Sequence, residues 1–214
     1  MVLENNYGPY LPADRDCRIL DIGCGSGRLL VYLHENGYGN LCGIDVDSSV
    51  LALIPAQVRG YTEHISDLSH YLRDHQAKFD LIIAKDVLYY FPRHEAPQRM
   101  REISDALRPG GTIIAEVFNA ALLTAGYTAA KDVGIQTMYT EQSLRSLLEA
   151  AGLNVQTVYG AGHGKGSWRR PFYALAVSLW REAMKLIYLL ERGVDPQNPK
   201  ILTKSLIAVA RRPD

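Results

Sequence analysis

The sequence has little of what marks several classes of protein. It holds three cysteines, an odd number without Cys-x-x-Cys spacing, so neither a disulfide framework nor a zinc site is expected. Its 23 basic and 23 acidic side chains cancel, which leaves no overall basic surface for nucleic acid. We therefore expect no bound metal, no nucleic-acid partner and a reducing compartment.

Long apolar runs are missing too. The first residues, Met-Val-Leu-Glu-Asn-Asn, lack the basic region and apolar run of a signal peptide, and no later stretch reaches membrane-spanning length. The 214 residues, 47% of them hydrophobic, suffice for one well-buried domain and are few for two. We expect a single domain over residues 1–214, located in the cytoplasm.

A glycine-rich turn between a strand and a helix is the most informative stretch present. Residues 17–22 predict a short buried strand, residues 26–36 an amphipathic helix, and Gly23, Gly25 and Gly27 alternate between them. Glycine allows a tight turn and close approach of a ligand, and the free N–H groups of the new helix point at that ligand. The stretch predicts a nucleotide-binding turn, and the alternative is a glycine-rich connection without a ligand.

The spacing of these glycines bears on the kind of nucleotide. The pattern is Gly-x-Gly-x-Gly, whereas a dinucleotide site has Gly-x-Gly-x-x-Gly. Arg28 stands where the dinucleotide pattern needs a small residue for close packing of helix on strand. A nicotinamide-dependent oxidoreductase is therefore the disfavoured alternative.

Strands alternate with helices along the rest of the chain, which predicts a parallel α/β sheet with right-handed crossovers. Further strands are expected at residues 41–45, 60–64, 78–86, 112–118, 155–159 and 205–210. Further helices are expected at residues 48–58, from 67 onward, and at 93–107, 140–151 and 172–191, with a loop over the site at 119–138. Ligands bind beyond the carboxyl ends of such strands, so residues 85–90 should line the site.

Asp45 and Asp67, two aspartates at strand ends, can each have two roles. Asp45 lies about 20 residues past the glycine turn, where a carboxylate accepts from both ribose hydroxyls. Its alternative role, capping the next helix, can be filled by Asp47 or Ser48, so we favour the ribose. Asp67 can cap a helix or accept from an adenine amino group, and from this residue alone the cap is favoured.

Five motifs in this order resemble those of the class I S-adenosylmethionine-dependent methyltransferases. They are residues 20–27 (Leu-Asp-Ile-Gly-Cys-Gly-Ser-Gly), Asp45, Asp67-Leu68, residues 79–82 (Phe-Asp-Leu-Ile) and residues 107–111 (Leu-Arg-Pro-Gly-Gly). The resemblance implies a Rossmann-like, doubly wound sheet of seven strands, mostly parallel with an antiparallel last strand, and helices on both faces. It also implies S-adenosyl-L-methionine as the cofactor.

Residue roles follow from the same resemblance. The glycine turn would take the methionine part of the cofactor, Asp45 the ribose, and Asp67 and Leu68 the adenine, while Lys85 and Asp86 would face the methyl group. The cofactor-binding residues so implied are Asp21, Gly23, Cys24, Gly25, Gly27, Asp45, Val46, Asp67, Leu68 and Lys85.

A narrower resemblance bears on the methyl acceptor. Residues 7–12, 139–144 and 202–208 are similar to a bacterial subgroup associated with surface-polysaccharide synthesis. That subgroup commonly reads Asp-Val-Leu-Glu-His after the fourth strand, whereas residues 86–90 here read Asp-Val-Leu-Tyr-Tyr, so a role for that histidine cannot be carried over.

We expect methyl transfer to a small-molecule or glycan acceptor, through oxygen. A non-catalytic cofactor-binding protein is the third hypothesis, because a fold does not guarantee its chemistry. The candidate catalytic residues are Asp86, Tyr89, Tyr90 and His163.

Residues 160–192 form an insertion before the last strand. A glycine-rich basic loop precedes a helix whose apolar face is too wide for packing on one side alone. We expect this helix to cover the active-site mouth or to pair with a second copy in a homodimer. Contact with a membrane surface ranks behind these, since the polar stripe of the helix is not strongly basic.

Overall fold

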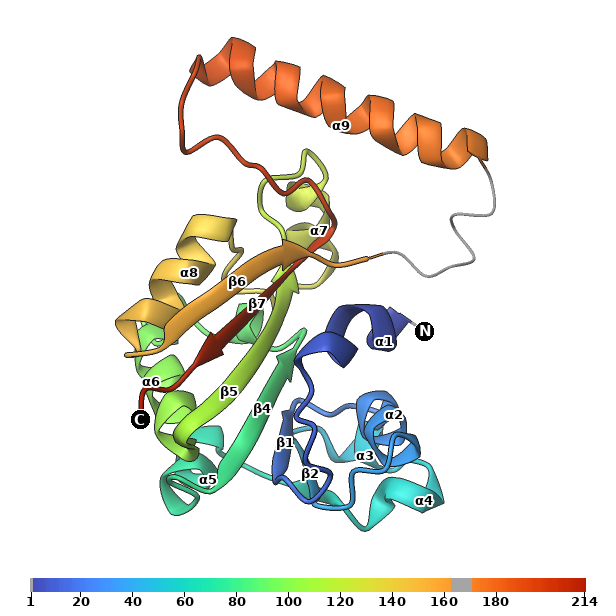
Figure 1. Ribbon diagram of the computed structural model, residues 1–214, viewed down its shortest axis with the longest axis vertical. Helices are drawn as coiled ribbons and strands as arrows, with labels where there is room; N and C mark the ends of the chain where they lie inside the picture. The colour runs from blue at the N-terminus through green and yellow to red at the C-terminus, as the bar shows by residue number, and fades with distance from the viewer. Residues whose placement is uncertain (1, 163–170) are drawn as a thin grey trace.

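A seven-stranded sheet organises the part of the chain that the structure, a computed structural model, describes: residues 2–162 and 171–214. The strand order is β3-β2-β1-β4-β5-β7-β6 (Figure 1). The strands are β1 (Ile19–Ile22), β2 (Leu41–Asp45), β3 (Thr62–His64), β4 (Phe79–Lys85), β5 (Leu107–Phe118), β6 (Asn154–Gly160) and β7 (Ser205–Arg211).

Strand direction confirms the predicted fold class. β1 pairs in parallel with β2 and β4, and β4 pairs in parallel with β5. The last strand, β7, lies between β5 and β6 and is antiparallel to both. The carboxyl ends of β1, β4 and β5 therefore meet at one edge, and Asp21, Lys85 and Glu116 come to lie near that edge.

Helices cover both faces of the sheet, as predicted. Alternate residues of β4 point to opposite faces: Ile82 packs in one core cluster, and Leu81 and Ile83 pack in the other. One cluster includes side chains from α5 (Leu68–Asp74), α6 (Ala96–Ala106) and α8 (Glu141–Ala150). The other includes side chains from α1 (Val2–Tyr7), α2 (Arg28–Glu35) and α4 (Ala56–Arg59).

Two local predictions were wrong. The helix expected over residues 48–58 is divided into α3 (Ser48–Leu51) and α4, because Pro55 lacks an N–H and disfavours helical backbone in the residue before it. The loop expected over residues 119–138 contains a short helix, α7 (Ala125–Lys131). Its three alanines favour helix, a preference that the neighbouring glycines masked in the sequence.

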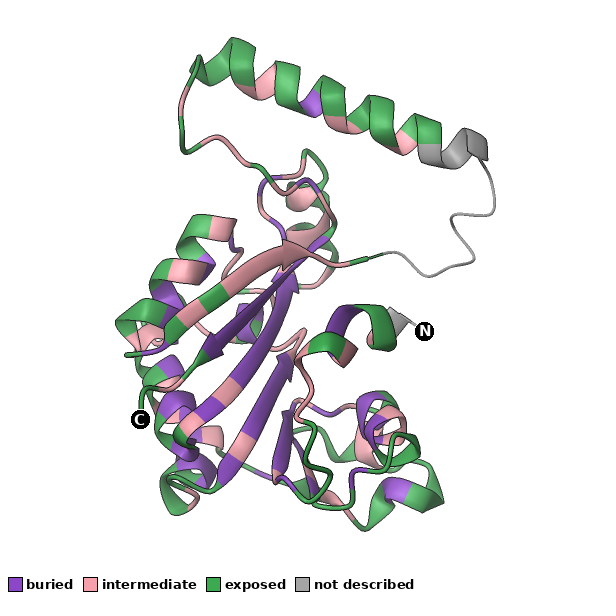
Figure 2. Ribbon diagram, in the orientation of Figure 1, coloured by how far each residue is buried: buried purple, intermediate pink, exposed green. Residues whose placement is uncertain are grey.

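The long helix α9 (Pro171–Arg192) lies at one end of the molecule, beyond α7 (Figure 1). Met184 is buried, and the Tyr188 hydroxyl donates to the carbonyl oxygen of Ala121 at 2.6 Å. Most of its other described residues are exposed (Figure 2). Among the described residues, none of the helices combines the length and apolar character needed to cross a membrane.

Gly111 is a position where the fold requires glycine. A Cβ atom there would lie 2.9 Å from the carbonyl oxygen of Arg108 and 3.1 Å from that of Phe79, and neither backbone atom can move freely. Gly111→Ala should lower the free energy of unfolding by about 1–3 kcal/mol, measured by urea denaturation.

Gly39→Ala is the matched control, since no atom lies within 4 Å of a Cβ built there. It should change the free energy of unfolding by less than about 1 kcal/mol. Equal stability of the two variants would contradict the steric argument.

Candidate active site

The glycine turn joins β1 to α2 and leaves open space above its centre. Gly23, Gly25 and Gly27 all have positive φ, a backbone conformation that other residues rarely adopt. A Cβ at Gly25 would meet no atom within 4 Å, so a ligand can approach the backbone there. The structure thus has the tight turn that the sequence predicted.

Asp45, at the end of β2, holds this turn in place. One carboxylate oxygen accepts from the Gly25 N–H at 2.8 Å, and the other accepts from the Asp47 N–H at 3.0 Å. A carboxylate offers about four acceptor positions, so two stay available for further donors. Asp45 therefore combines a structural role with spare capacity to accept hydrogen bonds.

Asp67 and Leu68, the residues predicted to contact the adenine, lie further along the edge formed by the carboxyl ends of the strands. Asp67 is the N-cap of α5, where it accepts from the His70 N–H at 2.9 Å, as the sequence favoured. Leu68 begins that helix and is half-buried, and Val46 is exposed. These residues, with Gly27 and Asp45, stand outside the lining of the cavity described next.

A cavity of about 550 Å³ lies over the carboxyl ends of β1, β4 and β5. Its lining includes predicted cofactor-binding residues (Asp21, Gly23, Cys24, Gly25 and Lys85) and predicted catalytic residues (Asp86, Tyr89 and Tyr90). Its other lining residues are Leu3, Asn6, Ser26, Arg28, Leu29 and Glu116. Sequence reasoning missed Glu116, although a lone acid near the end of an apolar strand was a usable signal.

Asp21 is the most unusual group in this cavity. Its side chain is buried on β1, and one carboxylate oxygen has no hydrogen-bond partner among the described residues. Burial raises the pKa of Asp21 to about 8, Asp45 adds to this rise, and Lys85 opposes it. At neutral pH the group is therefore mostly protonated in the free protein.

Two further acids and one cation surround Asp21. Lys85 forms an ion pair with Asp86, whose φ of 58° is left-handed and whose second carboxylate oxygen has no partner within the described part of the chain. The Tyr7 hydroxyl donates to Glu116. Burial, then the charge of Glu116, raises the pKa of Tyr7, and burial also raises the pKa of Glu116.

The N-terminal helix α1 closes one side of the cavity. Besides Tyr7, its Asn6 binds the end of β6: the side-chain oxygen accepts from the Gly162 N–H at 2.9 Å, and the backbone carbonyl accepts from the Tyr159 hydroxyl. The Tyr7 ring is buried between α1 and the sheet.

A second cavity, of about 440 Å³, adjoins the first, and Tyr89 lines both. Its other lining residues are Phe118, Leu122, Thr124, Tyr127, Thr128, Lys131, Asp132, Ile135 and Lys204. The Tyr89 ring stacks on Phe118 with 4.7 Å between ring centroids. The Tyr90 hydroxyl donates to Asp132 at 2.9 Å, which ties η2 (Leu88–Tyr90) to the segment after α7.

The fourth catalytic candidate, His163, lies outside the described residues. The other three candidates meet at the junction of the two cavities. Asp86 and Tyr90 line the first cavity, and Tyr89 stands between it and the second. No group of three or more His, Cys, Asp or Glu residues suited to a metal ion occurs in the described ranges.

The strand order of the sheet, the glycine turn after β1 and the Asp45 carboxylate at the end of β2 are together typical of a Rossmann-like methyltransferase fold. The family described as "Methyltransferase domain" matches residues 5–158, well over half of the chain. The chain therefore belongs to the class I S-adenosylmethionine-dependent methyltransferases. This assignment favours the methyltransferase hypothesis over the nicotinamide oxidoreductase.

Solved structures agree on the fold at low sequence identity. A SAM-dependent methyltransferase from Archaeoglobus fulgidus is 15% identical with a TM-score of 0.71, over 98% of this chain and 91% of that one. Another from Mesorhizobium loti is 19% identical with a TM-score of 0.70, over 99% and 98%. The [4+2]-cyclase SpnF is 21% identical with a TM-score of 0.61, over 99% and 79%. No curated protein matches the sequence.

The raised pKa of Asp21 predicts a stability that depends on pH. An aspartate in the unfolded chain has a pKa near 4, whereas that of Asp21 in the folded protein is about 8. Between these values the folded state retains a proton that the unfolded state releases, so this contribution to stability is lost as pH rises. Relative to Asp21→Asn, the wild type should lose on the order of 1–3 kcal/mol between pH 5 and pH 8.

Urea denaturation of both proteins at the two pH values measures this difference. Asp16→Asn changes an exposed aspartate and serves as the control, with the same change between the two pH values as the wild type. A wild type and Asp21→Asn that respond identically to pH would contradict the burial argument.

Proposed function

We propose that the protein transfers the methyl group of S-adenosylmethionine to an oxygen of a small-molecule or glycan acceptor. The main support for this proposal is the position of Tyr89 between the two cavities. One cavity has the glycine turn and the buried acid, the other has aromatic and apolar walls, and a single tyrosine lines both. Two reactants bound on either side of this position would meet there, as a bimolecular transfer requires.

The residues over β1 and β2 fit this cofactor. The open space at Gly25 admits a ligand to the backbone, and the spare acceptor positions of Asp45 suit two ribose hydroxyls. The unpartnered oxygen of Asp21 suits an ammonium group, whose charge would favour ionisation of this acid. Lys85 would provide a positive charge for the carboxylate of S-adenosylmethionine. When bound, the cofactor supplies an activated methyl group on a sulfonium.

The second cavity fits the acceptor. Tyr89 and Phe118 present a stacked aromatic wall, which can pack against a sugar or an aromatic ring, while hydroxyl groups of Thr124 and Thr128 offer hydrogen bonds. The glycan alternative draws support from the sequence resemblance to the polysaccharide-associated subgroup.

An oxygen acceptor has to lose its proton during transfer. Asp86 lies three residues before Tyr89, and one of its carboxylate oxygens has no partner within the described ranges. We assign Asp86 as the group that takes the proton, with Lys85 holding its other oxygen. Asp86→Asn should then lower kcat while the cofactor still binds.

Removal of the Asp45 carboxylate tests the cofactor site. Asp45→Ala should weaken S-adenosylmethionine binding by about 1.5–3 kcal/mol, the range for hydrogen bonds to a charged group, as measured by calorimetric titration. Asp47→Ala, two residues away, removes an exposed N-cap and should leave the affinity unchanged. Unchanged affinity in a folded Asp45→Ala protein would overturn the ribose assignment.

Replacement of Tyr89 tests the acceptor site. Tyr89→Leu keeps an apolar side chain but removes the ring stacked on Phe118, so the KM for the acceptor should rise or kcat should fall. Cofactor affinity should stay within about a factor of three, because the glycine turn and Asp45 are untouched. The measurement is methyl transfer to a panel of phenols and sugars, with cofactor affinity by calorimetry.

Tyr90→Phe serves as the matched comparison. It removes only the hydroxyl that donates to Asp132 and keeps the ring, so it separates hydrogen bonding from stacking. A collapse of cofactor affinity in Tyr89→Leu would instead place Tyr89 in the cofactor pocket alone.

A further inference from the structure

Two lysines, Lys131 and Lys204, line the second cavity of the active site, which has a volume of about 440 Å³. Lys131 is the last residue of α7, and Lys204 directly precedes β7. Both are exposed, and within the described part of the chain neither forms an ion pair with an acidic side chain. Their positive charges are therefore available to a ligand in this cavity.

Asp132 is the one acid that the described residues contribute to the lining of this cavity. One of its carboxylate oxygens accepts from the Tyr90 hydroxyl at 2.9 Å, and the other accepts from the Gly134 N–H at 2.9 Å. These hydrogen bonds hold the carboxylate in place and offset part of its charge. With two lysines against one carboxylate that already has donors, the charge of the lining is positive on balance.

The backbone that carries each lysine is bound to the rest of the site. The carbonyl oxygen of Lys204 accepts from the Asn119 N–H at 3.0 Å, and the buried Asn119 side chain donates to two carbonyl oxygens of residues 201–203. Lys131 lies next to the aspartate that binds the Tyr90 hydroxyl. Both lysines thus extend from segments whose positions relative to the cavity are fixed by hydrogen bonds.

Lys204 is close to the position where the two cavities meet. Its Nζ lies 5.8 Å from the centre of the Phe118 ring, and that ring stacks on Tyr89, which lines both cavities. Burial raises the pKa of Glu116, and the charges of Lys85 and Lys204 oppose this rise, so Lys204 also influences a group of the first cavity. Its charge is therefore separated from the junction by a single aromatic ring.

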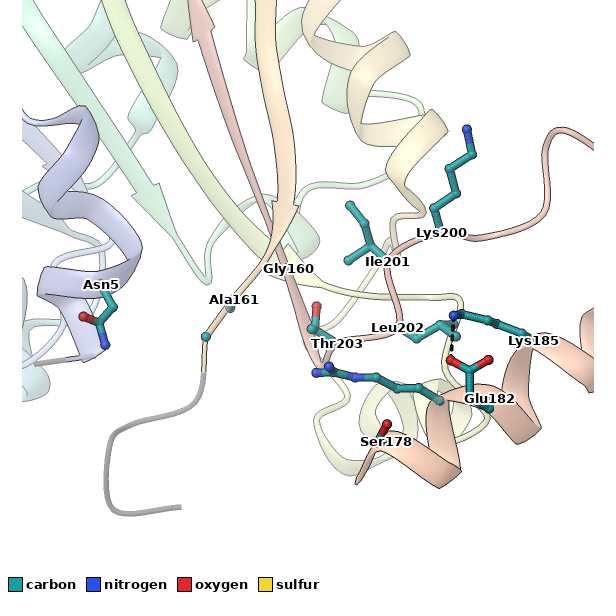
Figure 3. Close-up of a pocket in the computed structure, with 12 residues that line it drawn as sticks. Asn5, Gly160, Ala161, Ser178, Glu182, Lys185, Lys200, Ile201, Leu202 and Thr203 are labelled. Atoms are coloured by element: carbon teal, nitrogen blue, oxygen red, sulfur yellow. Dashed lines mark hydrogen bonds and ion pairs between the residues drawn. The ribbon is translucent and has the colours of Figure 1, made fainter. Parts of the chain in front are cut away.

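A larger cavity, of about 680 Å³, provides a comparison. It lies between α9, the end of β6 and residues 200–203 (Figure 3). One of its cations, Lys185, is paired with Glu182 at 2.7 Å, and Tyr89 does not line it. Lys200, an exposed lysine that lines this cavity and not the second cavity of the active site, is therefore a suitable control for Lys204.

We propose that the methyl acceptor carries an anionic group, a carboxylate or a phosphate, which Lys131 and Lys204 bind while its ring packs against Tyr89 and Phe118. This inference rests on the proposed function, because it treats the second cavity as the acceptor site. A lysine ammonium offers three donors and a positive charge, which suit the oxygens of either anion. An acidic sugar or a hydroxylated aromatic acid combines the ring, the hydroxyl group and the anion in one small molecule.

Calorimetric titration of the full chain saturated with S-adenosylhomocysteine tests this proposal, since the demethylated cofactor permits binding without turnover. The probes are two matched pairs: para-hydroxybenzoate with para-hydroxybenzamide, and a hexose monophosphate with the free hexose. The acid of at least one pair should bind at least about fivefold more tightly than its neutral counterpart. About 0.5 M salt should reduce this preference. The pair that shows the preference identifies the anion as carboxylate or phosphate.

Removal of the two charges should abolish the preference. In Lys131→Gln combined with Lys204→Gln, the acid and its neutral counterpart should bind with affinities within about a factor of two. Lys200→Gln changes an exposed lysine four residues before Lys204 and should retain the full preference. Circular dichroism and titration of S-adenosylmethionine establish that each variant is folded and binds the cofactor.

Three results would overturn the proposal: no binding of either acid, equal affinities within both pairs, or a preference that persists in the double variant. These results are distinct from failure of the proposed function. Methyl transfer to a neutral acceptor by a protein without acid preference would contradict the anion site alone. Acid preference that the double variant loses, in a protein that transfers no methyl group to any acceptor, would contradict the proposed function alone.

Discussion

Asp21 is a buried carboxyl group near the carboxyl end of β1, and the active-site edge is organised around the cost of placing it there. An isolated ionised carboxylate away from water is unfavourable by several kcal/mol or more, so an acid in such a place stays protonated or finds a cation. In the free protein Asp21 stays protonated at neutral pH, because burial raises its pKa to about 8. Lys85 is near enough to oppose that rise but pairs with Asp86.

This arrangement relates the stability of the free protein to cofactor binding. The unpartnered oxygen of Asp21 carries an unfavourable desolvation energy that no hydrogen bond from a described residue offsets. A ligand with an ammonium group would offset it, because the ligand provides both a donor and a positive charge. The site is thus strained without its ligand, which is a common property of binding sites.

Much of the fold followed from the sequence because strong local signals agreed with each other. The strand Leu41–Asp45 and the N-cap residues Asp67 and Thr140 were predicted at the positions where the structure has them. Each depends on residues within a few positions along the chain. The divided helix at Pro55 and the helix α7 were missed because a proline and an alanine-rich stretch were given too little weight beside their neighbours.

The cavity was harder to predict than the fold. Residues next to the glycine turn could be named, because a parallel sheet brings the carboxyl ends of its strands together. Glu116 was missed although it is a lone acid near the end of a predicted strand, whereas Asn6 could not be named, because it reaches the cavity through the docking of α1 against β6. The contact of Asn6 with Gly162 joins residues 156 positions apart, and such contacts leave no pattern in a single sequence.

The fold also limits what the family assignment implies about the acceptor. SpnF shares this fold and is a [4+2]-cyclase, so the sheet and glycine turn alone do not specify the reaction. Specificity has to come from elements added to that common core. Under the proposed function, this part falls to Tyr89 and Tyr90 after β4 and to the segment of α7 that completes the second cavity. These elements would shape the space for an acceptor.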